Sequence, residues 1–429
     1  MVITSCICVV AALLWDYVVR TGHRWLLLLG TLLLAVLSAA GLYHYEDLFP
    51  GLIASGWEGL YDGKAMAGLI WLLACLLAFP CLVVVAIARF FCRPRRRRRG
   101  RRRQRRSLGV TRRSFLKGLA ALIPVAAFAT SGAGNLLGER DLDTTYHVLK
   151  YKNLPDYLDG YKIGQLSDLH MGLFFSPRRL QEALDAVAAQ GVNRLEITGD
   201  LIDELALLPK AQAILKANAS RFPDGIDFCY GNHEYYRSFD AITAMLDDTP
   251  VRVLRNSTFQ ASRGCGQGLR GCNGRDGRSF YIAATDYSFA KGDEAQGRDQ
   301  GRNGRELGAV RMAAQRQGDV MGKAFVDKGR MMGQHDDKGI FRNLSQRFPD
   351  ILFPFFGKGF ITLTLCGHTH GAQFAPIAPL VTALGFKYLR GMFQKGDCRG
   401  YVNRGTGHWL PFRVLCSREV SVFELRKQA

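Results

Sequence analysis

The 429-residue chain is poor in histidine, and its first 92 residues are poor in charge. It has nine histidines, and four of them fall in a few short motifs. Its eleven cysteines include no pair of CxxC motifs, which argues against a zinc site of that type. The apolar N-terminal stretches hold few polar residues that could line a path, so a small-molecule transporter is a poor interpretation.

Residues 1–92 are predicted to form a transmembrane helical region of about three spans. A helix needs roughly 20 apolar residues to cross a bilayer. A weaker fourth stretch runs from Gly118 to about Leu137. Because several spans follow one another, a cleaved secretory signal at the start is a poor interpretation. The three apolar stretches are Val2–Val19, Trp25–Tyr43 and Met66–Phe91.

A run of eleven arginines between Arg93 and Arg106 supplies more than half of the formal net charge of +20. Basic flanks of membrane spans stay in the cytoplasm. We therefore expect residues 93–113 to form a cytoplasmic linker, and residues 141–429 to lie on the extracytoplasmic side of a multi-pass membrane protein. The run also suits contact with anionic lipid. Nucleic acid is not an expected partner, because no aromatic residues interleave the arginines.

Residues 114–140 have two interpretations. Thr111–Lys117 resembles a twin-arginine export signal, and the short, mildly apolar segment after it is typical of such signals. The same residues also suit a plain fourth span with a basic cytoplasmic flank. Both interpretations place residues 141–429 outside the cytoplasm. In that oxidising location Cys265 and Cys272 are the best-placed pair for a disulfide.

Residues 141–429 alternate strand and helix patterns, which is typical of an α/β fold. Residues 261–278 and 291–340 are rich in Gly, Arg, Gln and Asp and are interpreted as low-complexity insertions or loops. Strands are expected at residues 161–166, 195–198, 226–230, 252–257, 279–284 and 360–366, and helices at about 177–190, 209–219 and 239–249.

Four motifs rich in metal-ligand side chains each follow a predicted strand. Ligands gather at the carboxyl ends of strands in open α/β sheets, so we expect these motifs to share one site. Carboxylate, imidazole and amide donors suit a pair of divalent cations. One such motif alone is a weak signal, but four in this order are specific. The motifs are Asp168-Leu169-His170, Gly199-Asp200-Leu201-Ile202-Asp203, Gly231-Asn232-His233-Glu234 and Gly367-His368-Thr369-His370.

The motifs, together with Gly231–Tyr236, Gly367–Gly371 and Tyr401–Gly405, resemble the calcineurin-like metallophosphoesterase family, and specifically its membrane-associated bacterial branch. The resemblance covers about residues 145–260 and 341–427. It implies a four-layer α/β/β/α sandwich, preceded here by the N-terminal transmembrane helical region.

The resemblance also implies a role for each motif residue. A hydroxide bridging two divalent cations (Mn, Fe or Zn) would attack a phosphomonoester or phosphodiester in line. His233 would protonate the leaving oxygen or steady the phosphoryl group, and Asp203 would orient His233. The metal ligands carried over by motif are Asp168, His170, Asp200, Asn232, His368 and His370, with Asp200 shared between the two cations.

One ligand of the second cation departs from the family pattern. The family has a histidine in a short strand–His–x–Pro segment, which corresponds here to Phe341–Asp350, and Arg347 occupies the expected position. An arginine cannot ligate a cation and would repel it. His335, in the low-complexity stretch, is the histidine that could substitute. The second site is therefore expected to be weakened or lost.

Two hypotheses about function follow. The first is a membrane-anchored, divalent-metal-dependent phosphoesterase whose phosphorylated substrate is lipid-linked or envelope-derived, since the anchor keeps the site near the membrane. The second is a catalytically weakened relative, with an incomplete second metal site, that acts as a binding protein. Metal content and turnover distinguish them. Specificity resides in loops around the site, so the substrate itself cannot be named from the sequence.

Overall fold

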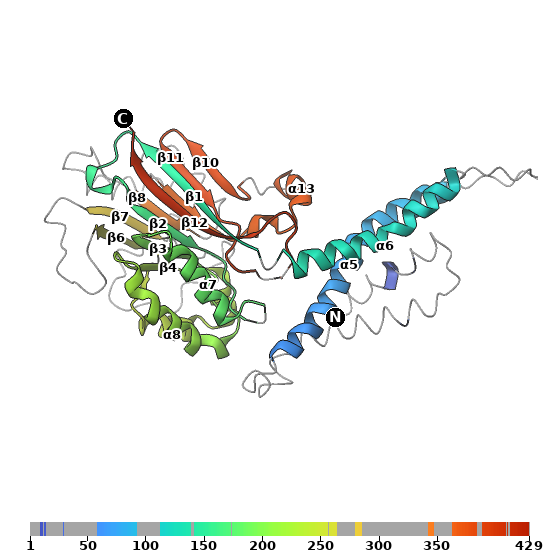
Figure 1. Cartoon of the computed structure of the whole chain (residues 1–429), viewed down its shortest axis with the longest axis horizontal. Helices are drawn as coiled ribbons and strands as arrows, with labels where there is room; N and C mark the ends of the chain where they lie inside the picture. The colour runs from blue at the N-terminus through green and yellow to red at the C-terminus, as the bar shows by residue number, and fades with distance from the viewer. Residues whose placement is uncertain are drawn as a thin grey trace, which may run out of the picture. The chain divides into compact units, whose positions relative to one another are not determined.

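The chain divides into two compact units, Met1–Leu137 and Gly138–Ala429, which are described separately (Figure 1). Almost all of the first two predicted spans, the arginine run, the Cys265–Cys272 pair, His335 and Arg347 lie outside the described residues. The computed structural model describes residues 9–11, 13, 29, 58–91, 112–138, 141–172, 174–255, 257–263, 279–284, 342–346, 363–383, 388–408, 410 and 412–428.

The first unit contains two long helices, α5 (Glu58–Phe91) and α6 (Arg112–Leu136). Within α5, the 19 residues Ile70–Ala88 are long and apolar enough to cross a membrane, and they fall inside the third predicted span. Among the described residues of α6, the apolar stretch is Leu122–Leu136, which is shorter than a span. The two helices are joined by a hydrogen bond of 2.7 Å from Ser131 Oγ to the carbonyl oxygen of Ile70.

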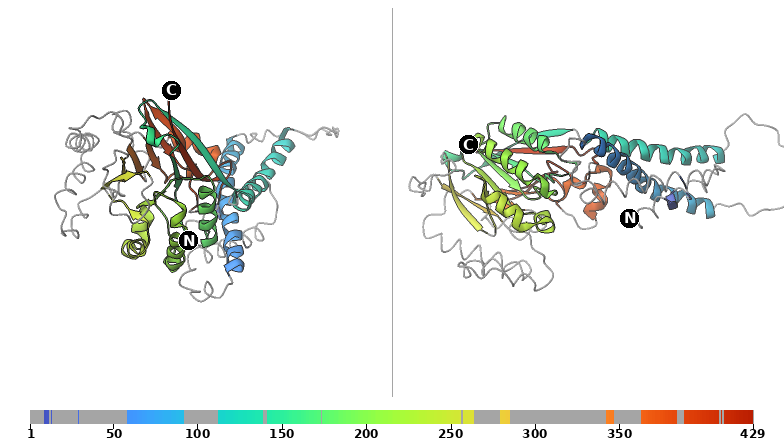
Figure 2. Two further views of the ribbon diagram at one scale, coloured as in Figure 1. Left: turned by 60° about the vertical axis from the view of Figure 1, so that its left-hand side comes forward. Right: turned by 90° about the horizontal axis from the view of Figure 1, so that it is seen from below.

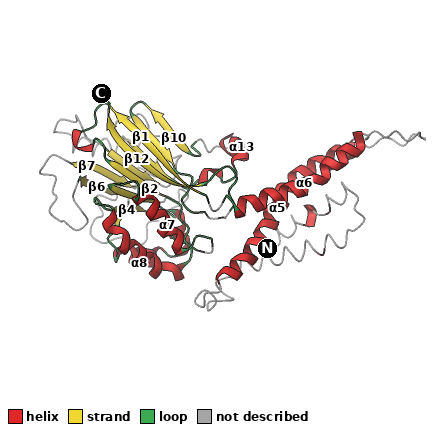
Figure 3. Ribbon diagram, viewed as in Figure 1, coloured by secondary structure: helices red, strands yellow, loops and turns green. Residues whose placement is uncertain are grey.

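The second unit contains two six-stranded sheets (Figures 1 and 3). The first sheet has the order β1-β12-β2-β3-β4-β5 and is mixed. Strand β12 pairs parallel with β1 and antiparallel with β2, whereas β2 to β5 run parallel to one another. Its strands are β1 (Leu142–Tyr151), β2 (Lys162–Leu166), β3 (Arg194–Thr198), β4 (Ile226–Cys229), β5 (Arg252–Val253) and β12 (Arg418–Lys427).

The second sheet has the order β10-β11-β9-β8-β7-β6. Strands β7, β8, β9 and β11 run parallel, and an antiparallel strand closes each edge. Its strands are β6 (Ser257–Ser262), β7 (Ser279–Ala284), β8 (Arg342–Gln346), β9 (Leu363–Cys366), β10 (Gly391–Lys395) and β11 (Cys398–Val402).

Alternation of apolar side chains along the strands builds two cores. In β12, Val420 and Val422 join the core under the helices, whereas Phe423 and Leu425 join the core between the sheets. The helices on the first sheet lie on one face of it (Figure 2). They present apolar stripes such as Leu180, Leu184 and Val187 to the strands. These helices are α7 (Pro177–Ala188), α8 (Leu208–Asn218) and α10 (Phe239–Asp247), and the short α9 (Asn232–Arg237) precedes α10.

The α/β fold predicted from the sequence is confirmed. The single strand predicted at Arg252–Ser257 is wrong: β5 ends at Val253 in the first sheet and β6 begins at Ser257 in the second, because the chain crosses between the sheets there. The long edge strand β1 was not predicted. On the outer face of the second sheet, the described residues provide a small cluster of Cys366, Tyr388 and Val402, and the predicted fourth layer of helices stays a prediction.

Candidate metal centre

The loops that follow β2, β3, β4 and β9 carry the four motifs, and their side chains converge beyond the carboxyl ends of these strands. Their backbone is unusual. Of the eight described non-glycine residues with positive φ, five belong to these motifs. Left-handed backbone is unfavourable for L-residues and persists where the surroundings impose it, often at functional sites. The five residues are Asp168, His170, Asp200, His368 and His370.

Asp168, His170 and His370 form a first group of converging donors, with ligand atoms within 4.8 Å of one another. The Nε2 atoms of His170 and His370 lie 3.2 Å apart. The Nε2 atom of His370 lies 3.6 Å from Asp168 Oδ1. Two imidazole nitrogens and a buried carboxylate oxygen thus face a common point.

His170, Asp200 and His233 form a second group. Asp200 Oδ2 lies 3.5 Å from His170 Nε2 and 3.9 Å from His233 Nε2. The other oxygen, Oδ1, accepts the backbone N–H of His233 at 3.0 Å. The Oδ2 atom is therefore the oxygen turned towards the imidazoles, and His170 belongs to both groups.

Asp203 binds two histidines at once. Its Oδ1 lies 2.5 Å from His233 Nδ1, and its Oδ2 lies 3.2 Å from His170 Nδ1. A carboxylate on Nδ1 fixes the ring so that Nε2 faces the site. The contact with His233 has the geometry expected from the sequence, whereas the contact with His170 was not expected and no spacing signal pointed to it.

The same contacts shift the pKa values of His170 and Asp203. Burial works to lower the pKa of His170, but the hydrogen bond that its ring donates to Asp203 and the charges of Asp200, Asp203 and Asp168 outweigh burial and raise that pKa. Burial works to raise the pKa of Asp203, yet hydrogen bonds from His170 and His233 hold it well below its usual value. The surrounding carboxylates thus favour positive charge at this position.

The loops after β3 and β4 are held together by what we call the within-sheet clasp, formed by Asp200, Gly231, His233 and Glu234. Glu234 Oε2 accepts the N–H groups of Asp200 (3.0 Å) and Gly231 (2.7 Å). Its Oε1 accepts the N–H of Leu201 (2.7 Å). A Cβ atom on Gly231 would lie 1.9 Å from Asp200 Oδ1, so only glycine fits. Sequence analysis gave Glu234 no role.

Glu234 is fully buried, and this affects its charge. Burial, and next the nearby charge of Asp200, raise the pKa of Glu234 to about 7, while the three backbone N–H groups oppose that shift. The carboxyl group of Glu234 therefore fixes the backbone of the two loops, and burying its charge beside Asp200 costs free energy.

The loops after β2 and β9 are held by a second device, the cross-sheet clasp, formed by Ser167, Asp168, Gly367 and His368. Both carboxylate oxygens of Asp168 accept the backbone N–H of His368, at 3.1 and 2.9 Å. Ser167 Oγ donates to Asp168 Oδ2 at 2.5 Å. A Cβ atom on Gly367 would lie 2.1 Å from Asp168 Oδ2, so glycine is again required.

Comparison with known proteins shows which proteins the chain is similar to. No family model matches the chain. It is 27% identical over 336 residues to an uncharacterized metallophosphoesterase of Bacillus subtilis, spanning 74% of this chain and 98% of that protein. It is 26% identical over 362 residues to a zebrafish transmembrane protein with a metallophosphoesterase domain, spanning 82% of this chain and 74% of that protein. The chain is a relative of the metallophosphoesterases.

Other matches are more partial. An uncharacterized metallophosphoesterase of Helicobacter pylori is 27% identical over 282 residues, and the match spans 64% of that protein's length. Among solved structures, a dimetal phosphatase from zebrafish is 11% identical with a TM-score of 0.32, covering 58% of this chain and 88% of that one. That likeness is too distant to assign a function.

The donors of this metallophosphoesterase relative fit divalent cations. Imidazole nitrogens and carboxylate oxygens are the donors that Zn, Fe and Mn accept, and here they are mostly buried. The rings of His170 and His233 are oriented by hydrogen bonds between their Nδ1 atoms and Asp203. The field that raises the pKa of His170 would equally favour a bound cation in place of the proton.

The remaining predicted ligands, Asn232 and His368, occupy different situations. Asn232 is buried at the first position of α9, directly before His233. His368 contributes its backbone N–H to Asp168. Within the described ranges, neither group of converging donors includes the His368 ring. The structure therefore brings Asp168, His170, Asp200, His233 and His370 together most closely.

Proposed function

We propose that the chain is a divalent-metal-dependent phosphoesterase that hydrolyses a phosphomonoester or phosphodiester. The observation that supports this most is the convergence of donors from three separate loops onto His170, whose ring nitrogen Nε2 lies 3.2 Å from His370 and 3.5 Å from Asp200. Together with the sequence relatives, this donor set favours metal-assisted hydrolysis over other chemistry at the same edge of the sheets.

The side chains have distinct tasks in this proposal. Bound divalent cations would lower the pKa of water and neutralise phosphoryl oxygens. The metal ligands would be Asp168, His170, Asp200 and His370, with Asn232 and His368 for the second cation. His233 holds Nδ1 against Asp203, so its Nε2 can carry a proton towards the leaving oxygen. Asp203 fixes that tautomer and stabilises the charged ring.

We also propose that the enzyme is anchored to a membrane. The apolar helix Ile70–Ala88 supports this, as do the two relatives named transmembrane proteins with a metallophosphoesterase domain, from zebrafish and cattle. The multi-pass topology and the extracytoplasmic location of residues 141–429 rest on the charge pattern around the predicted spans. On this proposal the substrate is a phosphorylated component of the membrane or envelope.

A catalytically weakened binding protein is the second candidate. Two observations favour it: Arg347 stands where the family has a histidine ligand, and the His368 ring is outside both groups of converging donors among the described residues. Both concern the second cation, so they predict a protein that retains one metal and has little or no turnover.

One experiment separates the two candidates. The full-length protein is freed of metal, reloaded with Mn²⁺, Fe²⁺ or Zn²⁺, and assayed for bound metal and for hydrolysis of bis-p-nitrophenyl phosphate and p-nitrophenyl phosphate. Two cations with turnover, abolished by Asp200→Asn, support the enzyme. One cation or none, without turnover under any metal, supports the binding protein. A gain of metal and rate in Arg347→His would place that residue at the second cation.

A further inference from the structure

The chain leaves the metal centre through an apolar segment that the unit does not bury. After His370 it passes through the short helix Ala375–Ile377 and through α13 (Ala378–Ala383), and neither contains a buried residue. Ile377 is 41% exposed and Leu380 is 59% exposed. Phe374, Ile377 and Leu380 are spaced three residues apart along these turns, so they follow one side of the segment.

A second segment lies beside the first and adds a third exposed apolar side chain. The backbone of Val414 pairs with this segment, through N–H bonds from Val414 to Gln373 O (2.9 Å) and from Ala375 to Val414 O (3.0 Å). The next residue, Leu415, is 83% exposed. We call residues 374–383 with Leu415 the apolar tip; α13 is labelled in Figure 1.

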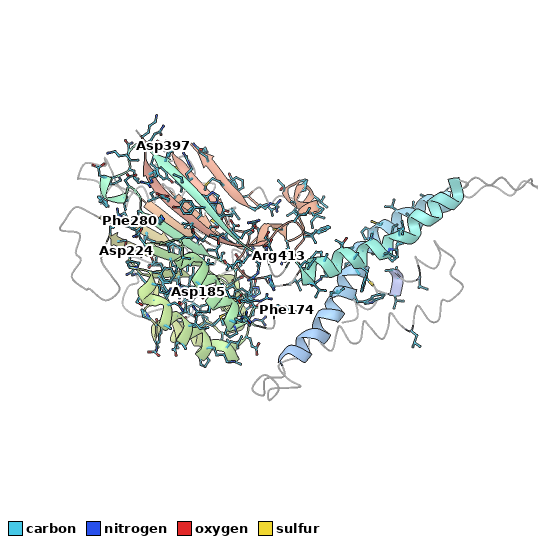
Figure 4. All side chains as sticks on the ribbon, viewed as in Figure 1. Phe174, Asp185, Asp224, Phe280, Asp397 and Arg413 are labelled. Atoms are coloured by element: carbon cyan, nitrogen blue, oxygen red, sulfur yellow. The ribbon has the colours of Figure 1, made fainter. Side chains whose placement is uncertain are left out.

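The exposure of Leu415 is imposed by its neighbours. Arg413 (labelled in Figure 4) and Cys416 are buried, and the Arg413 guanidinium donates to the carbonyl oxygens of Gly407 and Cys416. Leu415 itself has φ 54°, a left-handed backbone that disfavours a leucine. An apolar side chain held outward on a strained backbone calls for a function, since strain of this kind tends to be retained where it is used.

The charge pattern indicates what meets the tip. From Gly359 to Phe386 the sequence has no Lys, Arg, Asp or Glu, and the residues flanking this stretch are Lys358 and Lys387. No acidic residue occurs between Asp350 and Asp397. The nearest charged residue after residues 374–383 is therefore basic, Lys387, and the nearest acidic residue after Leu415, Glu419, is buried. An exposed apolar element without exposed acidic neighbours along the chain suits the interface of an anionic bilayer. An interface with a protein partner would commonly be surrounded by a rim of polar residues that includes both acidic and basic side chains.

We propose that the apolar tip inserts into the head-group region of an anionic lipid bilayer. This inference rests on the proposed function for its consequence: His370 lies directly before the tip in the chain, so insertion would bring the metal centre to phosphate esters at the bilayer surface. The helix Ile70–Ala88 of the same chain supplies a segment that can hold it at such a surface.

Photo-cross-linking of the full chain tests the contact. Benzoylphenylalanine is placed at position 380 or 415, and at position 148 as control, where Val148 is 50% exposed on the edge strand β1. The protein is reconstituted in nanodiscs of phosphatidylcholine with phosphatidylglycerol and irradiated. We expect lipid adducts at 380 and 415, severalfold above position 148. Adducts to residues 1–137, a cross-linked dimer, or lipid adducts no higher than the control would each overturn the proposal.

A second readout separates this proposal from the proposed function. The double variant Leu380→Glu/Leu415→Glu is compared with Val148→Glu for hydrolysis of soluble bis-p-nitrophenyl phosphate and of a long-chain alkyl nitrophenyl phosphate embedded in the same nanodiscs. We expect about a tenfold loss with the embedded ester alone. If the double variant hydrolysed the embedded ester as fast as Val148→Glu does, the docking role would be refuted and the proposed hydrolase activity would stand. Absence of any hydrolysis by the unmodified protein would refute the hydrolase, and the lipid adducts would still report on the tip.

Discussion

The two clasps of the metal centre use the same device in different settings. In each, a carboxylate receives a backbone N–H from the loop of another strand, and a glycine leaves room for that carboxylate. The within-sheet clasp joins β3 and β4, which are neighbours in one ladder with Thr198 opposite Cys229. The cross-sheet clasp joins β2 and β9, which belong to different sheets.

The difference shows what positions each half of the site. Between β3 and β4, main-chain hydrogen bonds set the register, and Glu234 adds three more acceptor contacts. Between β2 and β9, the link is side-chain packing of residues such as Ile163 and Leu365 plus one hydrogen bond from Gln165 Nε2 to Cys366 O at 3.0 Å. The half that contains His370 therefore depends on closure of the sandwich, whereas the half that contains Asp200 depends on the first sheet.

The largest effects are expected from Gly231→Ala and Gly367→Ala. Each new Cβ would overlap a carboxylate of the candidate metal centre, and a displacement of about 1 Å in such a site costs about a hundredfold in rate. Bound metal and kcat/KM on an aryl phosphodiester measure the loss. Gly191→Ala is the control, because nothing lies within 4 Å of a Cβ there. Its φ of 64° strains an alanine, whereas Gly231 has φ −99°, so the control has backbone strain without the overlap. If Gly191→Ala lost as much activity, the carboxylate overlap would not be the cause.

Asp203→Asn should have the next largest effect, because Asp203 serves a histidine in each donor group. An amide cannot accept hydrogen bonds from both Nδ1 atoms, so His170 and His233 would lose their fixed orientation. A loss of about 10- to 100-fold in metal affinity or activity is expected. Metal titration by calorimetry checks it. Unchanged metal affinity with a lower kcat would show that the contact with His170 is not needed for binding.

Glu234→Gln should weaken the within-sheet clasp alone. The amide offers one acceptor oxygen, so at least one buried N–H among those of Asp200, Gly231 and Leu201 loses its partner, at about 1–3 kcal/mol. Urea unfolding and metal titration measure the cost. Glu182→Gln, on the exposed face of α7, is the matched control. If Glu234→Gln were as stable as Glu182→Gln, the proposed contribution of Glu234 to the within-sheet clasp would be contradicted.

Ser167→Ala should have the smallest effect of these five substitutions. Asp168 would lose one donor but keep the N–H of His368, so the expected cost is about 1 kcal/mol. Comparison with Glu234→Gln shows which of the two clasps loses more stability and metal affinity when one side-chain contact is removed. A larger loss in Ser167→Ala, measured by the same unfolding and titration, would mean that the cross-sheet clasp depends on its side-chain donor more than on the backbone.

The sequence predicted the α/β fold, and it indicated that the four motifs lie at strand ends because each motif directly follows a short apolar run. It could not show which oxygen of Asp200 faces the imidazoles, because that depends on the His233 N–H from another loop. Nor could it assign Glu234, whose partners are backbone groups without a sequence signature. The break between β5 and β6 was missed since both halves share the same strand pattern, and only the crossing between sheets separates them.

The position of β12 has a consequence for biosynthesis. Strands β1 and β2 follow each other in the chain, yet β12 lies between them, pairing with β1 over ten positions from Leu142↔Arg418 to Tyr151↔Lys427. Of the described strands it is the last to be translated. During translation, β1 therefore lacks its partner β12 until every other described strand has been synthesised. Pairing between strands so far apart in the sequence forms slowly. A nascent chain halted before β12 would present two open strand edges, the kind of surface that chaperones bind.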